Sequence, residues 1–334
     1  MRKLKWLRLY LVVLAIGWQV PIQAQIKASN SSQKPQTIPT CFDLSWDGNL
    51  VLTGGKNGYL KLWGVQEGQL LKTYDSVTEK NEIKLVAFSP SGKHCFAYFG
   101  YWVALPMVLE THAGKVIQGF KKQGFPVFSL STVAFSRDET KLLAKKCELE
   151  VGTGKVVKKP YYFSSNQTAM VLSPDGAYLL TNGGGKKALL WNHQHGEFVN
   201  AFIGHSQEVS AVNFSKNGQR VLSAASDVKM WDTKIGRLLK TFKSTANDPL
   251  RAVMFSPDQA QIWATTNEQC LFWDVATGKL INTINLEGAT IQKARLVNNA
   301  LQILTTTKER SEGQIWKVTP QQKQLVQKFD FTKQ

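Results

Sequence analysis

The chain is poor in cysteine and in acidic residues, and it has no apolar run long enough to cross a bilayer. Four cysteines among 334 residues are too few for a small disulfide-held scaffold. The longest apolar run covers about ten residues, whereas a membrane-spanning helix needs roughly 20, so a multi-span membrane protein is excluded. With 43% hydrophobic residues, the composition is that of a globular protein with a sizeable core.

The shortage of acidic residues leaves a strongly basic chain. There are 41 lysines and arginines against 24 aspartates and glutamates, which gives a formal net charge of +17. A positive field favours an acidic protein, an anionic lipid or envelope polymer, or nucleic acid as the partner. Charge alone does not choose among these partners.

The first 24 residues have the order of a secretory signal peptide. Four basic residues among the first eight precede an apolar run, Leu9 to Trp18, and small Ala24 follows. We therefore expect export, with cleavage near Ala24 and a periplasmic or secreted mature protein; the alternatives are an uncleaved anchor and a mispredicted start. Export argues against nucleic acid as the partner. Residues 25–37 are polar and lack apolar periodicity, which predicts a flexible lead-in.

Motifs for catalysis and cofactor binding are absent from the sequence. It has no P-loop, no dinucleotide fingerprint and no nucleophile elbow. His193 and His195, with Glu197, form the only metal-like cluster, but too few ligands lie nearby for a complete site, so a solvated turn is favoured. We therefore expect no metal, no cofactor and no enzymatic activity.

Seven repeats occupy the chain after residue 37. An apolar anchor, usually followed by serine and a turn-forming sequence, recurs at intervals of 37 to 47 residues. In every copy the residue two before the anchor is apolar, the residue eight after it is large and apolar, and the next one is small. The anchors are Leu44, Phe88, Phe135, Leu172, Phe214, Phe255 and Leu296.

Each repeat has the pattern of four short strands joined by turns. Proline, aspartate and glycine after the anchor supply turn chemistry, and the apolar–small alternation beside them is typical of strands. Four-stranded units of this length are the signature of a propeller blade, which buries both faces only against its neighbours. We therefore predict an all-β, seven-bladed β-propeller with four antiparallel strands per blade over residues 38–331.

The repeats resemble those of the WD-repeat family. A tryptophan recurs in the third strand of five copies, and the fifth copy also has Gly204-His205 before it and Trp231-Asp232 in that strand. The resemblance specifies the fold strongly and the function hardly at all. It also implies a structural hydrogen-bond network in blade five, formed by His205, Ser223, Asp227 and Trp231.

Ring closure is expected to differ from that of many family members. Many of them pair an N-terminal strand into the last blade, whereas here the first repeat starts with its inner strand near Ile38. The last repeat has its own outer strand, Gln324 to Phe331. We therefore expect seven contiguous blades, no exchanged closing strand, and a seam between the first and last blades held by face packing alone. An added edge strand from residues 25–36 is the alternative.

A docking surface is predicted on one face of blades two to four. We call the top face the one that carries the loops between strands two and three of each blade and the loops between blades. Aromatic residues and lysine pairs gather there, which suits an acidic protein partner. Alternatively, the aromatics replace missing core tryptophans and the lysines only aid solubility. The predicted residues are Phe99, Tyr101, Trp102, Lys121, Lys122, Phe125, Lys145, Lys146, Lys158, Lys159, Tyr161, Lys186 and Lys187.

Together these features predict an exported, monomeric, non-catalytic platform for protein–protein contact in the cell envelope. One alternative is a binder of anionic polymer or membrane surface that uses the basic top face. The other is an exported propeller enzyme or quinone-cofactor binder, for which the inner strands offer few converging acids, bases or metal ligands. No pair of cysteines is forced into bonding distance, so buried or half-buried free thiols are expected at Cys41, Cys95, Cys147 and Cys270.

Overall fold

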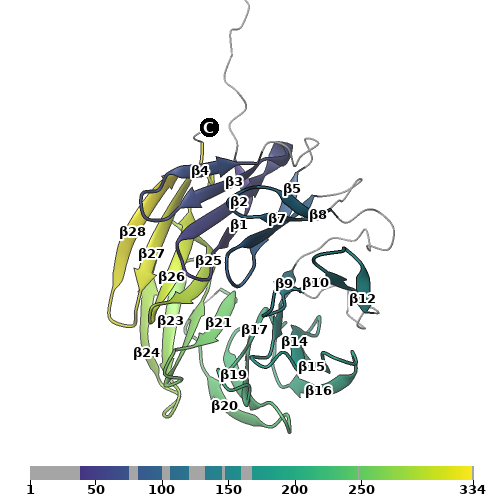
Figure 1. The fold of residues 1–334 in the computed structure, drawn as a ribbon. Helices are drawn as coiled ribbons and strands as arrows, with labels where there is room; N and C mark the ends of the chain where they lie inside the picture. Colours follow the sequence, from purple (N-terminus) through teal and green to yellow (C-terminus); the bar gives the residue numbers. More distant parts are fainter. Residues whose placement is uncertain are drawn as a thin grey trace, which may run out of the picture. The chain divides into compact units, whose positions relative to one another are not determined.

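The computed structural model describes residues 38–74, 82–99, 106–119, 132–144, 147–158, 168–246 and 248–332. In these ranges, 28 strands form seven antiparallel sheets of four consecutive strands each, arranged around a ring (Figure 1). The predicted seven-bladed all-β propeller is thereby confirmed. The helical content of the described residues is one 3-10 turn, η1 (Lys56–Gly58), and no helix among them is long and apolar enough to cross a membrane.

The first four blades run in chain order. Blade one contains β1 (Pro39–Leu44), β2 (Leu50–Gly55), β3 (Leu60–Gly64) and β4 (Leu70–Thr73). Blade two contains β5 (Ile83–Phe88), β6 (His94–Phe99), β7 (Met107–Glu110) and β8 (Val116–Gly119). Blade three contains β9 (Val133–Phe135), β10 (Lys141–Ala144), β11 (Cys147–Glu150) and β12 (Val156–Lys158). Blade four contains β13 (Met170–Leu172), β14 (Tyr178–Asn182), β15 (Lys187–Asn192) and β16 (Phe198–Ile203).

The last three blades complete the ring, and the first strand of each blade lies toward its centre (Figure 1). Blade five contains β17 (Ala211–Phe214), β18 (Arg220–Ala224), β19 (Val228–Asp232) and β20 (Leu238–Phe242). Blade six contains β21 (Ala252–Phe255), β22 (Gln261–Thr265), β23 (Gln269–Asp274) and β24 (Leu280–Asn285). Blade seven contains β25 (Thr290–Val297), β26 (Ala300–Thr306), β27 (Glu312–Val318) and β28 (Lys323–Asp330).

The core lies between the blades. Seven apolar clusters of buried residues are found, one for each pair of neighbouring blades. Leu62 of blade one meets Leu109 of blade two, for example, and Leu180 of blade four meets Trp231 of blade five. This arrangement explains the repeated apolar positions, because a single sheet would leave one apolar face in water.

The serine after the anchor fixes the turn between the first two strands. In blade one the Ser45 hydroxyl donates to the Asp47 carboxylate at 2.5 Å and accepts from the Leu50 amide at 2.9 Å. Gly48 in this turn has a φ of +76°, which favours glycine. The same serine–aspartate bond recurs in blades three, four and six. The repeated sequence motif is therefore a local hydrogen-bonded turn.

A glycine follows four of the five recurring tryptophans by five residues, and it marks a contact between blades. Gly236 has a φ of +70°, and a side chain there would overlap Asn200 of the preceding blade's outer strand. In the next pair, the Lys240 ammonium donates to the Val275 carbonyl oxygen at 3.0 Å. The outer strand of one blade thus contacts the turn between strands three and four of the next blade. These contacts add to the apolar clusters between blades.

Ring closure agrees with the expectation in one respect and corrects it in another. The described blades contain no exchanged strand, because each sheet consists of four consecutive strands. The seam is not held by face packing alone. Trp63 packs edge-on against Phe331 at 5.3 Å, but Asp43 of β1 also forms ion pairs with Lys293 and Arg295 of β25. Closing the ring brings these strands together, so residues 252 positions apart become partners.

Candidate functional site

Most of the predicted docking residues lie outside the described residues. This applies to Tyr101, Trp102, Lys121, Lys122, Phe125, Lys145, Lys146, Lys159 and Tyr161. The backbone of Lys158 ends β12. Lys186 and Lys187 are exposed beside the loop between β14 and β15, on the top face.

The structure corrects the assignment of Phe99 to a docking surface. Its side chain is only 4% exposed and packs in the cluster between blades one and two with Leu60 and Ile83. Phe99 is the last residue of β6, and it faces the neighbouring blade rather than solvent. Phe99 is therefore a core residue, as the alternative interpretation of these aromatic residues predicts.

Blade five contains a buried polar network of three side chains. His205 Nε2 and Ser223 Oγ are 2.6 Å apart, and the Trp231 indole N–H donates to the same oxygen at 2.8 Å. Ser223 is fully buried, and the other two are no more than 6% exposed. No substrate can reach a serine in this position, so the histidine–serine pair is structural rather than the start of a hydrolase triad.

Asp227, the fourth residue expected in this network, has other hydrogen-bond partners. Its carboxylate pairs with the Lys243 ammonium at 2.8 Å and accepts from the Ser244 amide at 3.1 Å. The negative charge of Asp227 raises the pKa of His205, but larger effects of opposite sign outweigh it. Burial, with a smaller contribution from Lys229, lowers the pKa of His205 to about 4. The imidazole is therefore neutral at pH 7.

The indole N–H groups of the other recurring tryptophans are also paired, although their blades depart from the family pattern. In blades one, four and seven the indole N–H donates to a threonine hydroxyl at the position of Ser223, at 2.9 to 3.2 Å. Blade six has Ala264 at that position, and the Trp273 indole N–H donates instead to the Lys243 carbonyl oxygen at 2.9 Å. A buried indole N–H thus always finds an acceptor, as the cost of leaving it unpaired demands.

The central channel contains a cavity of about 750 Å³ that runs along the inner strands of the ring. Residues of β9, β13, β17 and β21, nearly all of them apolar, form a large part of its wall. Arg137, Arg251, Lys293 and Arg295 also line it, with Asp43 as the acidic residue among them. The sequence led us to expect few converging charged groups here, so the basic lining was missed.

Asp43 is neutralised by the channel's own basic residues. It is fully buried, Arg295 donates to both carboxylate oxygens at 3.1 Å, and Lys293 lies 2.8 Å from one of them. Burial alone would raise the pKa of Asp43, but these two cations outweigh it and hold the pKa below its ordinary value of 3.8. The basic charge of Arg137 and Arg251 in the channel is therefore left without an acidic counterpart among the lining residues.

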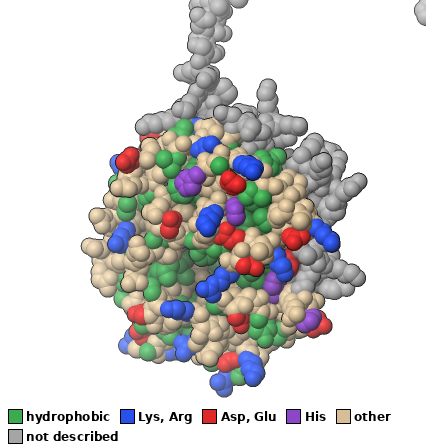
Figure 2. Space-filling model, viewed as in Figure 1, with side chains coloured by type: hydrophobic (Ala, Val, Ile, Leu, Met, Phe, Trp, Pro, Cys, Tyr) green, Lys and Arg blue, Asp and Glu red, His purple; other side chains and the backbone are tan. Residues whose placement is uncertain are grey.

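An exposed tryptophan marks the opposite end of the channel from the top face. We call this end the bottom face; it carries the turns between strands one and two and between strands three and four. Trp46 lies in the first of these turns, is 55% exposed, and has the Arg295 guanidinium 4.1 Å from its ring centroid. Figure 2 shows a hollow in one face of the ring, with hydrophobic, basic and acidic side chains around it.

A smaller polar cavity of about 330 Å³ lies between blades three and four. Glu148 there is 2% exposed, with the Lys141 ammonium at 3.2 Å and His193 Nε2 at 3.6 Å. His193 therefore faces Glu148. Within the described ranges, no group of three or more histidine, cysteine, aspartate or glutamate side chains is arranged to hold a metal ion.

The four cysteines are free thiols, as expected from their spacing. Cys95, Cys147 and Cys270 are buried, and Cys41 is half-buried. Burial raises the pKa of all four thiols to about 12. They are therefore protonated at neutral pH and are poor nucleophiles.

Comparison with known proteins agrees with this geometry. The family model for the WD domain, G-beta repeat, matches residues 31–64 and 196–232, which include β1 to β3 and β17 to β19. The chain is a seven-bladed β-propeller in which two repeats match the WD-repeat model, so the resemblance seen in the sequence is confirmed. The second match covers Ser223 and Trp231, the pair that carries the blade-five network.

Several curated proteins are similar to parts of this chain, and one of those below has a WD-repeat name. Autophagy-related protein 16 of Arabidopsis thaliana is 26% identical over 164 residues, 48% of this chain and 32% of that protein. Pre-mRNA-processing factor 19 homolog 2 of the same plant is 36% identical over 91 residues, 27% of this chain and 17% of its own. WD repeat domain-containing protein 83 homolog of Dictyostelium discoideum is 25% identical over 125 residues, 37% of this chain and 38% of its own. The chain thus spans less than two fifths of each of these relatives.

Proposed function

We propose that this WD-repeat propeller is an exported, non-catalytic scaffold that binds an acidic partner protein. Propellers of this family typically bind other proteins, and a rigid ring of seven blades offers a preformed surface at low ordering cost. The observation that carries the acidic partner is the central channel. Its basic residues outnumber its one acidic residue, and that residue is already paired with Lys293 and Arg295.

The cellular location is part of the proposal. Its support is the basic, apolar, small-residue order of the first 24 residues. Mass spectrometry of the protein from its native host should find a mature N-terminus near Gln25. An intact Met1 on protein from the cytosolic fraction would contradict export.

A retention experiment tests the binding function. The immobilised mature protein is exposed to an envelope extract of the native host at about 50 and about 500 mM salt, concentrations that change charge screening strongly. The proposal predicts a specific protein, retained in a fixed stoichiometry at both concentrations, with slower association at high salt. Retention of lipid or polymer alone, lost at high salt, would instead favour the binder of anionic surfaces.

A further inference from the structure

The bottom mouth of the channel has a composition unlike its walls. The residue that follows the anchor serine lies in the turn between the first two strands, and these turns from successive blades reach the mouth. Six of these residues line the channel cavity or a second one of about 470 Å³ beside it. They are Trp46, Pro90, Arg137, Pro174, Lys216 and Pro257. The rim thus combines one indole and three proline rings with two cations. An aspartate follows the rim residue in four of these turns, but its carboxylate accepts a hydrogen bond from the anchor serine and does not line either cavity: Asp47, Asp138, Asp175 and Asp258.

Trp46 is exposed, and yet its orientation is supported from inside the ring. The Arg295 guanidinium beside its ring is itself held by Asp43, which is fully buried. A cation near an aromatic face, anchored by a buried carboxylate, gives a pre-organised platform. Exposed aromatic side chains next to arginine are frequent anchors of protein interfaces.

Basic side chains continue from this rim along the channel. Lys216 and Arg137 are exposed in the bottom turns, and Arg295 and Lys293 lie two residues apart on β25. Arg251 precedes β21, at the opposite end of the channel. Lys293 and Arg295 share the single carboxylate of Asp43, so this stretch of the channel keeps a net positive charge that favours an acidic residue of an extended segment.

We propose that the bottom mouth of the channel binds an extended acidic polypeptide segment, with a proline or other apolar side chain on Trp46 and carboxylates beside Lys216 and Arg137. This inference rests on the proposed scaffold function and adds to it the site and the partner's chemistry. Aromatic-lined grooves recognise extended proline-containing segments because these lose little entropy on binding. Lys216 and Arg137 add positive charge at the rim, and this charge selects acidic segments.

Copies of this chain do not fit the mouth. Residues 25–37 of the lead-in contain two lysines and no carboxylate, and a second copy carries the same net charge of +17. Like charges brought together at a basic rim repel each other. The occupant is therefore a different, acidic protein.

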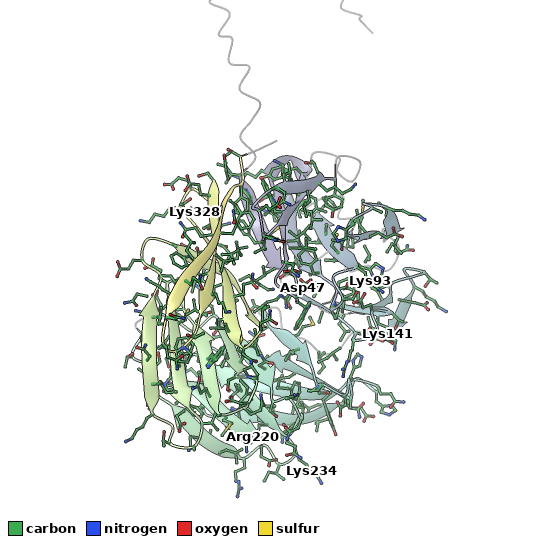
Figure 3. All side chains as sticks on the ribbon, turned by 60° about the vertical axis from the view of Figure 1, so that its left-hand side comes forward. Asp47, Lys93, Lys141, Arg220, Lys234 and Lys328 are labelled. Carbon is green, nitrogen blue, oxygen red and sulfur yellow. The ribbon has the colours of Figure 1, made fainter. Side chains whose placement is uncertain are left out.

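A labelled peptide of six glutamate–proline pairs tests the proposal, with six glutamine–proline pairs as the uncharged control. Fluorescence anisotropy measures binding to the full mature chain. We expect Lys216→Glu to weaken binding of the acidic peptide by about 10-fold or more, because a rim charge is reversed. Lys234→Glu is the matched control. It makes the same change in an exposed turn of the same blade and face, but between the two outer strands (Figure 3).

A second pair of variants tests the aromatic platform. Trp46→Ala should weaken binding by about 30-fold, the loss typical of an interface anchor. Ile235→Ala, a truncation of a side chain that is 61% exposed on the outer part of the same face, should leave binding unchanged. Circular dichroism and thermal unfolding establish that all four variants fold, which is expected because every altered side chain is exposed.

The outcomes separate this proposal from its alternatives. Absence of acidic-peptide binding, equal binding of the uncharged peptide, or equal losses for Lys216→Glu and Lys234→Glu would overturn it. Binding of anionic phosphatidylglycerol vesicles, lost in Lys216→Glu without any peptide binding, would assign the mouth to lipid instead. If the retained envelope protein binds Lys216→Glu as well as the unaltered chain, the scaffold function stands and this site is wrong.

Discussion

Two polar networks in this propeller differ in charge, in position and in how far they reach. The blade-five network is neutral and lies within one sheet, where Ser223 joins His205 to Trp231. The seam network is charged. The Asp43 carboxylate pairs with Lys293 and Arg295 of blade seven and accepts from the Phe88 amide of blade two at 2.8 Å. One network stabilises a repeat unit, while the other connects three blades where the ring closes.

This difference shows where a closed ring without an exchanged strand places its specific contacts. Within a blade, backbone pairing already fixes the sheet, so a neutral network only adds to it. At the seam no backbone pairing joins the first and last sheets, since each consists of its own four strands. Aromatic packing there is supplemented by buried ion pairs, whose geometry depends on correct register between blades.

The largest effect is expected from Asp43→Asn. The substitution keeps the shape of the side chain but removes the buried carboxylate that pairs with Arg295, which is 11% exposed, and with Lys293, which is 37% exposed. Breaking a buried ion pair in this way costs about 3–5 kcal/mol of unfolding free energy, which urea unfolding measures.

Lys243→Ala provides the contrast. It removes an ion pair whose lysine is 81% exposed, and we expect a loss of at most about 1 kcal/mol. Equal losses would show that the seam has no special role.

Ser223→Ala should have the next largest effect. It leaves the Trp231 indole N–H and the His205 imidazole without their shared oxygen, and an unpaired buried polar group costs about 1–3 kcal/mol. Ala264→Ser is the matched reverse change in blade six, where Trp273 already donates to a backbone carbonyl. Its effect should stay within about 0.5 kcal/mol. Chemical denaturation of both variants decides the comparison, and a stable Ser223→Ala protein would contradict it.

Coupling between substitutions distinguishes a network from independent contacts. His205→Ala and Ser223→Ala should be non-additive by about 0.5–3 kcal/mol, because they break the same hydrogen bond. His205→Ala and Lys243→Ala should be closer to additive, since Asp227 bonds to Lys243 and Ser244 rather than to His205. A double-mutant cycle with the opposite ranking would place Asp227 inside the network after all.

The two networks should also lose stability at different pH. The pKa of His205 is lowered in the folded chain to about 4 from 6.5, so its contribution is complete above pH 6.5 and declines as the pH falls toward 4. The slope should be at most about 1 kcal/mol per pH unit. The lowered pKa of Asp43 gives a contribution present above about pH 3.8 and lost at lower pH. Thermal unfolding of His205→Gln between pH 7 and 4 should show a flatter dependence than the unaltered chain.

The repeat fold could be predicted from the sequence because its determinants are local. The anchor serine, the turn and the small residue at the position of Ser223 lie within a few residues of one another, and each repeat supplies them again. The indole–hydroxyl pairs are local too, because the two residues are only 8 to 11 positions apart. The seam could not be predicted, because Asp43 and Arg295 are 252 residues apart and meet only in the closed ring.

The candidate site was harder to predict for a related reason. Trp46 and Lys216 occupy the same repeat position, but only the ring shows that this position forms the rim of the channel. Phe99 was misassigned because an aromatic residue at a strand end can face either the neighbouring blade or solvent. The lysine pairs of the top face, such as Lys186 and Lys187, remain a prediction about association rate, since exposed charges steer encounter more than they fix a complex.

Site-specific photo-cross-linking in the native host tests the central claim most directly. A photoreactive amino acid replaces Lys216 at the bottom mouth or Lys234 on the outer part of the same face. Partner binding at the channel predicts an adduct with one acidic protein from position 216, identified by mass spectrometry, and none from position 234. Adducts of equal yield from both positions, or an adduct from position 234 alone, would contradict binding at the channel mouth.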